Sequence, residues 1–138
     1  FIPGYRITPL PANHDQNASP FIFLIEELKT KKHMLYAHDS GFFFEDVFDY
    51  LYHNVKHLDL VSLDCTGAIK LGWKDHHMSI DVDKEVMERL KKDGIVDDKT
   101  KIVLNHFSHN GGANYDDLVK LEKELGVIIS YDGLEVEF

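Results

Sequence analysis

Apolar runs of strand length alternate along this chain with segments whose apolar residues recur every three or four positions. Dense runs rich in β-branched and aromatic residues predict strands over 5–12, 20–28, 33–37, 58–63, 101–105, 127–130 and 134–138. Helical spacing of apolar residues predicts helices over 45–55, 78–94 and 114–126. Strands that alternate with helices are typical of an α/β fold in which the helices cover a sheet.

Turn residues between these segments refine the expected topology. The polar stretch 29–32 separates two strands and predicts a β-hairpin. Asp132 and Gly133 predict a second hairpin, between the last two strands. Pro9 and Pro11 are expected to break the first strand near its end, because proline cannot donate to a strand ladder.

Composition narrows the classes of function. The 138 residues suit one domain, and 43% of them are hydrophobic, which is typical of a globular protein. The formal net charge of −9 disfavours nucleic acids and anionic membrane surfaces as partners, since both attract a positive field. No stretch approaches the roughly 18 apolar residues of a membrane span. A single cysteine, Cys65, cannot form an internal disulfide and fits a reducing, cytoplasmic location.

Histidine and aspartate residues recur where predicted strands end. Four apolar segments are followed by such a residue, namely His14, Asp39, Asp64 and His106. In α/β sheets, sites form where strands end and loops begin. Imidazole and carboxylate together suit zinc, manganese or iron, so the sequence predicts a metal site at this edge of the sheet.

Each of these residues also has a structural interpretation. Asp39 could belong to an Asx-turn, and His14 to a turn after two prolines. Between the neighbours His38 and Asp39, we expect Asp39 to face the site and His38 the core. Asp64 is expected to anchor backbone amides rather than to act in the chemistry.

The remaining histidines divide into pairs and isolated residues. His106 and His109 are expected to supply one ligand and one outer group, and one of His76 and His77 is expected to be exposed. Cys65 is interpreted as a small buried residue. Three further histidines are expected to be solvated: His33, His53 and His57.

Taken in order, the segments PLPANHD, YAHDSG, DHHMS and LNHFSHNG resemble the second half of the metallo-β-lactamase fold, closest to PhnP-like phosphodiesterases of the carbon–phosphorus lyase pathway. The resemblance runs from about Tyr5 to the C-terminus and implies an αββα sandwich. It implies that His14, Asp39 and His106 bind metal, with Asp39 bridging two ions. It also implies that His77 contacts the scissile phosphate or protonates the leaving group, and that His109 lies near the substrate.

This resemblance implies a metal-dependent hydrolase with two divalent ions, zinc or manganese. A hydroxide held by both metals would attack small cyclic or diester phosphates. Two alternatives stay open at this point. One is another hydrolase of the same fold, acting on a thioester, a lactam or RNA. The other is an inactive fragment that serves as a binding module.

The sequence departs from the family in one respect, because the first metal motif, HxHxDH, is absent. The chain also begins at Phe1, directly before a predicted strand. We therefore expect residues 1–138 to be one partial domain whose N-terminal half is missing. Such a half would expose an apolar sheet face, which favours association with the missing half or with itself.

Overall fold

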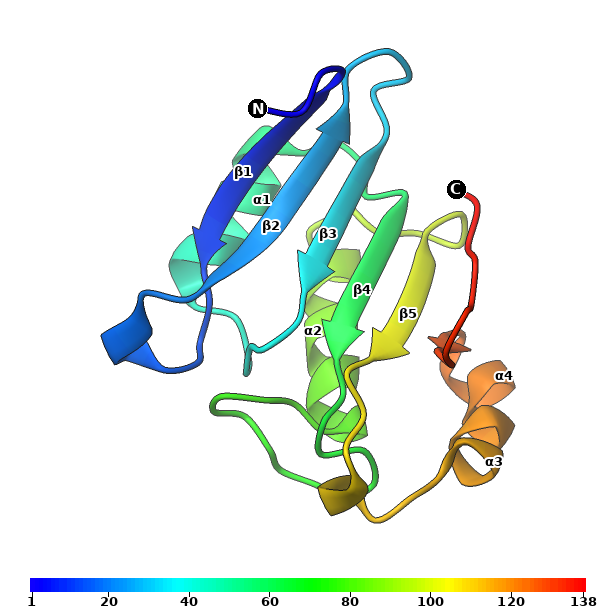
Figure 1. The fold of residues 1–138 in the computed structure, drawn as a ribbon. Helices are drawn as coiled ribbons and strands as arrows, with labels where there is room; N and C mark the ends of the chain where they lie inside the picture. Colours follow the sequence, from blue (N-terminus) through cyan, green and yellow to red (C-terminus); the bar gives the residue numbers. More distant parts are fainter.

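The computed structural model describes all residues, 1–138, and contains one six-stranded sheet (Figure 1). Its strands are β1 (Tyr5–Pro11), β2 (Phe21–Glu27), β3 (His33–Ala37), β4 (Leu60–Asp64), β5 (Lys101–Asn105) and β6 (Ile128–Ile129). Their spatial order follows the sequence. The β1–β2 and β2–β3 pairs are antiparallel, whereas the β3–β4, β4–β5 and β5–β6 pairs are parallel. The predicted hairpin at 29–32 is therefore confirmed.

Two long helices connect the parallel strands. Helix α1 (Glu45–Asn54) lies between β3 and β4 in the chain, and α2 (Ile80–Lys92) lies between β4 and β5. Both cover the same face of the sheet (Figure 1). Their apolar sides pack into one core with the alternate residues of the strands that point toward them, and its largest fully buried members include Phe48, Leu51, Leu90, Leu35, Leu63 and Leu104. The expected α/β fold with helices on a sheet is confirmed.

The opposite side of the sheet, called here the open face, carries no helix (Figure 1). The register aligns Ile7, Ile25, Met34 and Leu60 across four strands, and these side chains point away from α1 and α2. Several large apolar residues of this face are exposed, with Ile7 at 40% and Phe21 at 51%. A sheet that is apolar on both faces is unusual unless both faces are covered.

The last predicted strand, 134–138, is not formed, and the hairpin at Asp132-Gly133 is wrong. Strand β6 pairs parallel with β5 and is only two residues long. A turn then redirects the chain, with the Leu134 amide donating to the Tyr131 carbonyl at 3.0 Å. The residues after it line a cavity of about 670 Å³ with β4 and β5 on the open face. Residues 134–138 pair with no strand, so their alternating pattern does not produce one.

Two other expectations need correction. The first strand continues through Pro9 to Pro11, because β1 is an edge strand and a missing amide on its free side costs no ladder bond. The predicted helix 114–126 is divided into α3 (Tyr115–Leu118) and α4 (Glu122–Leu125) by the 3₁₀ turn Val119–Leu121. The tighter 3₁₀ winding shifts the phase of the helix, so Leu118 is buried but Leu121 is only partly so. No helix is long and apolar enough to cross a membrane.

Candidate metal centre

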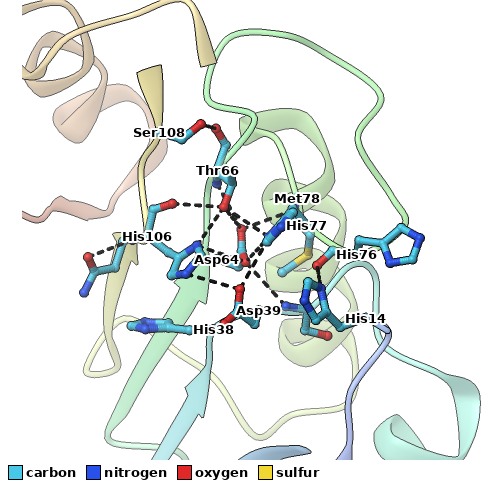
Figure 2. Close-up of polar contacts among 12 residues, drawn as sticks. His14, His38, Asp39, Asp64, Thr66, His76, His77, Met78, His106 and Ser108 are labelled. Carbon is cyan, nitrogen blue, oxygen red and sulfur yellow. Dashed lines mark hydrogen bonds and ion pairs between the residues drawn. The ribbon is translucent and has the colours of Figure 1, made fainter. Parts of the chain in front are cut away.

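The carboxyl ends of three parallel strands bring the candidate residues together (Figure 2). Asp39 follows β3, Asp64 is the last residue of β4, and His106 follows β5. The loop before α2 adds His77. Each of these four residues offers a nitrogen or oxygen atom, and the four atoms lie within 4.8 Å of one another. The sheet edge predicted from the sequence is therefore where these side chains meet.

The backbone is held in an uncommon conformation at two of these positions. Asp39 has φ 50° and His106 has φ 61°, both in the left-handed region. Residues other than glycine rarely adopt it, and such strain gathers at functional sites when the surroundings enforce it. At His106 the enforcement is visible, since its amide donates to the Asn105 Oδ1 at 2.7 Å.

Asp64 is fully buried and anchors the centre. Its Oδ1 accepts the Thr66 amide at 2.9 Å and the Thr66 hydroxyl at 2.8 Å. Its Oδ2 accepts from the His77 Nδ1 at 2.8 Å. Because protein donors engage both oxygens of this buried carboxylate, Asp64 organises its neighbours. This is the anchoring role that the sequence favoured.

His77 is oriented by this carboxylate. Its Nδ1 faces Asp64, so the proton on Nδ1 is donated to Oδ2 and the Nε2 atom carries the lone pair in the neutral ring. The ring stacks on His106 with centroids 5.6 Å apart and planes at 21°. His77 is thus half-buried beside the candidate metal ligands. Its Nδ1 is held by Asp64, and its Nε2 makes no hydrogen bond.

Asp39 and His106 have the geometry of two ligands of one cation. The distance from Asp39 Oδ1 to His106 Nε2 is 3.3 Å. Two ligands at about 2.1 Å from a tetrahedral zinc ion lie about 3.4 Å apart. The Asp39 side chain is 57% exposed, so a bridging ion can reach its oxygens. This donor pair fits a divalent metal without rearrangement.

His14 approaches the same group from the loop after β1. Its ring meets the His77 ring edge-on, with centroids 5.0 Å apart. Its Nδ1 lies 2.9 Å from the His76 carbonyl oxygen, and only a protonated Nδ1 can donate to a carbonyl. The Nε2 atom is therefore left with a lone pair, as in histidines that bind metals. His76 itself is exposed, as expected for one member of that pair.

Backbone contacts hold the three loops of the centre together. The Gly41 amide donates to the carbonyl oxygen of Asn13, which precedes His14, at 2.7 Å. The Phe42 amide donates to Lys74, in the loop that leads to His77, also at 2.7 Å. A Cβ on Gly41 would lie 2.0 Å from the Lys74 carbonyl oxygen, so only glycine permits this approach.

The structure does not bring every candidate to the centre. His109 is exposed in the 3₁₀ turn His109–Gly111 and is not part of the group of four, so its place near a substrate stays a prediction. His38 does not face the core. It lies on the open-face side, 2.7 Å from the Ser62 hydroxyl, and burial together with the nearby His106 lowers the pKa of its ring. Thr66, which contacts three members of the group, had no local signal that singled it out.

A second cluster, of one histidine and two aspartates, lies at the amino ends of the same strands, where His57 was expected to be solvated. Instead, its Nδ1 lies 3.3 Å from Asp59 and its Nε2 lies 3.0 Å from Asp97. The hydrogen bond to His57 lowers the pKa of the Asp97 carboxyl. His57 is therefore a cross-link between two loops. Cys65, by contrast, is buried as expected, and burial raises the pKa of its thiol.

No protein-family model matches this sequence, and no curated protein matches it either. Solved structures do match its fold. The metallo-β-lactamase-fold protein YhfI from Bacillus subtilis superposes with a TM-score of 0.64 and 19% identity, over 97% of this chain and 49% of that chain. A diphosphatase from the PhnP family gives a TM-score of 0.66 and 19% identity, over 100% of this chain and 45% of that chain. The isothiocyanate hydrolase from Delia radicum gut bacteria gives a TM-score of 0.66 and 17% identity, over 100% of this chain and 56% of that chain.

These matches show the fold of the chain. The sheet and its helices have the arrangement found in metallo-β-lactamase-fold proteins, as the sequence resemblance implied. The chain spans about half the length of these proteins. Identities this low carry the fold and not the activity.

Proposed function

We propose that this chain forms the second half of a metal-dependent hydrolase and that its sheet edge holds divalent cations. The observation that carries this proposal is the 3.3 Å separation of Asp39 Oδ1 and His106 Nε2, with the other nitrogen of His106 engaged by the protein. His14 would add its Nε2 to the same centre. Mixed imidazole and carboxylate donors accept zinc and manganese, which are the metals we propose.

Within this class we propose a phosphodiesterase that acts on small cyclic or diester phosphates. Divalent cations supply an activated water and neutralise charge on phosphoryl oxygens. In a protein with a net charge of −9, an anionic substrate needs such a local positive charge. The diphosphatase among the structural matches supports a phosphorylated substrate.

His77 has the arrangement of a proton donor to the leaving oxygen. Asp64 holds its Nδ1 at 2.8 Å and would stabilise the ring when it is protonated. The Nε2 atom then faces the reacting group and can transfer a proton as a bond to oxygen breaks. Since Asp64 is buried and fixed by Thr66, the ring is aimed before substrate arrives.

We further propose that the open face packs against the remaining half of the fold, which would also supply the HxHxDH ligands. Exposed apolar residues cover this face, among them Tyr5, Ile7, Phe21 and Tyr36. The structural matches are about twice as long as this chain, which is enough for a second sheet. The cytoplasmic location stays a prediction from the single cysteine.

Native mass spectrometry of the purified protein, followed by assays, tests these proposals. We expect bound zinc or manganese, and a complex heavier than the 15.9 kDa of this chain. We then expect hydrolysis of bis-p-nitrophenyl phosphate and of cyclic nucleotides that stops on chelation and returns with added metal. A bare monomer that binds no metal would contradict a metal site in this chain and would favour the binding module. Turnover of thioesters, lactams or isothiocyanates, but not of diesters, would contradict the phosphodiesterase alone.

A further inference from the structure

We propose that the Thr66 hydroxyl is a positioning group that fixes the His106 ring as its Nδ1–H tautomer, so that Nε2 presents a lone pair to the metal. The effect on metal binding rests on the proposed metal centre, whereas the tautomer itself follows from the contacts of Thr66 alone. Neither the sequence nor the fold comparison assigns a role to Thr66.

The Thr66 hydroxyl lies among the side chains of Asp64, His77 and His106 (Figure 2). Thr66 is 7% exposed and follows the end of β4. Its Oγ1 lies 2.8 Å from His106 Nδ1, 2.8 Å from Asp64 Oδ1, 2.9 Å from the His106 carbonyl oxygen and 3.2 Å from His77 Nδ1. One hydroxyl therefore contacts both imidazoles and the carboxylate between them.

Counting protons decides the tautomer. A hydroxyl has one proton to donate and two lone pairs with which to accept. Asp64 Oδ1 and the His106 carbonyl oxygen can only accept, so they compete for the single Thr66 proton. The contact with His106 Nδ1 must then be made by a proton on that nitrogen, which donates to Oγ1.

The carboxylates around His106 do not decide the tautomer by themselves. Asp64 Oδ2 lies 3.5 Å from Nδ1 and Asp39 Oδ1 lies 3.3 Å from Nε2, so each attracts a proton to a different nitrogen, and the 2.8 Å contact with Thr66 decides for Nδ1. With Nδ1 protonated, the lone pair of Nε2 points toward Asp39, 3.3 Å away. The Thr66 contact thus leaves His106 in the state that a cation requires.

The arrangement also couples the two histidines. His77 and His106 are 29 residues apart in sequence, yet each places Nδ1 against the Thr66–Asp64 pair. Loss of the hydroxyl would leave His106 Nδ1 with only the longer contact to Asp64. The ring could then rotate or change tautomer, whereas His77 would keep its 2.8 Å bond.

The first test is the tautomer of His106 in the metal-free protein, read from the ¹⁵N chemical shifts of its ring at a pH where the ring is neutral. We expect Nδ1 to be protonated in the wild type. In Thr66→Val, which keeps the shape but removes the hydroxyl, we expect a mixture with Nε2–H, and Thr66→Ser should restore the wild-type spectrum. If Thr66→Val does not fold, Thr66→Ala takes its place.

The second test is the affinity for Zn²⁺, titrated against a competing chelator. Loss of a group that orients a ligand costs about 10–100-fold in metal affinity. We expect that loss in Thr66→Val and recovery in Thr66→Ser. Thr100→Val is the matched control. Thr100 is also buried, and its hydroxyl lies 3.3 Å from the His57 ring, but it lies at the amino ends of the strands, away from the metal centre. We expect this control to keep the wild-type affinity.

The outcomes separate this inference from the proposed function. A wild type that binds no zinc contradicts the metal centre, while the tautomer measurement still decides the role of Thr66. An Nε2–H tautomer in the wild type overturns the inference. So does a folded Thr66→Val that keeps both the Nδ1–H tautomer and the zinc affinity.

Discussion

The two ends of the central strands carry clusters of the same residue types with opposite properties. At the carboxyl ends, His77 and His106 surround Asp64 and Thr66. At the amino ends, His57 lies between Asp59 and Asp97, beside the Thr100 hydroxyl. Composition alone does not distinguish them.

The difference lies in what each cluster leaves unengaged. Both nitrogens of His57 face carboxylates, so the ring has no nitrogen without a partner. At the other end, His77 is held through Nδ1 alone and its Nε2 makes no contact of this kind, while the Nε2 of His106 faces the exposed Asp39 at 3.3 Å. There the left-handed backbone of Asp39 and His106 adds strain, which is absent at His57. The candidate site is therefore distinguished by a free atom, the Nε2 of His77, rather than by its residue types.

The largest effect is expected from Asp39→Ala. Removing the proposed bridging carboxylate should lower diesterase activity by more than about 10⁴-fold, beyond the loss of a proton donor alone, and should reduce the bound metal. Metal analysis and turnover are measured together. Asp97→Ala, at the other end, is the control and should keep both. Retained metal in Asp39→Ala would mean that Asp39 is not a ligand.

A smaller loss is expected from His77→Ala. Removing the proposed proton donor should lower turnover by about 10²–10⁴-fold and leave the metal content unchanged. Steady-state kinetics and metal analysis on the same sample check this. His57→Ala should leave turnover intact, since its ring is engaged elsewhere. Loss of metal in His77→Ala would show that His77 is a ligand instead.

A third carboxylate, Asp83, sharpens the contrast with Asp64. Both are fully buried, but neither oxygen of Asp83 has a hydrogen-bond partner, and burial raises its pKa well above the ordinary value. Its unfolded-state pKa is lower, so stability should fall as pH rises above about 4, by up to about 1.4 kcal/mol per unit. Denaturant unfolding at pH 5 and 8 measures this slope. Asp83→Asn should flatten it, and parallel curves for both proteins would contradict the assignment.

The smallest effect is expected from Asp97→Asn. The hydrogen bond from His57 lowers the pKa of Asp97, so its contribution is present above the ordinary carboxyl pKa and is lost as pH falls through the lowered value. The variant should melt slightly below the wild type near pH 6, and the gap should close in acid. Thermal melts across this range check it. A gap that persists in acid would point to a cause other than the charge.

The sequence predicted what depends on local pattern. The strands that carry Asp39, Asp64 and His106 follow from their apolar runs, and parallel strands bring their ends together. The Thr66–His106 contact joins residues 40 positions apart, and no local pattern reports it. The prediction of a strand over 134–138 was wrong for the opposite reason. Its local alternation is present, but a strand also needs a partner strand to pair with.

The prolines of β1 bear on how this chain would aggregate when its open face is uncovered. With Pro9 and Pro11 on one edge of the sheet and only two residues of β6 on the other, neither edge offers a long ladder of free amides and carbonyls. Growth into cross-β fibrils needs such a ladder. Self-association should therefore involve only the open face, and it should stop at discrete face-to-face pairs.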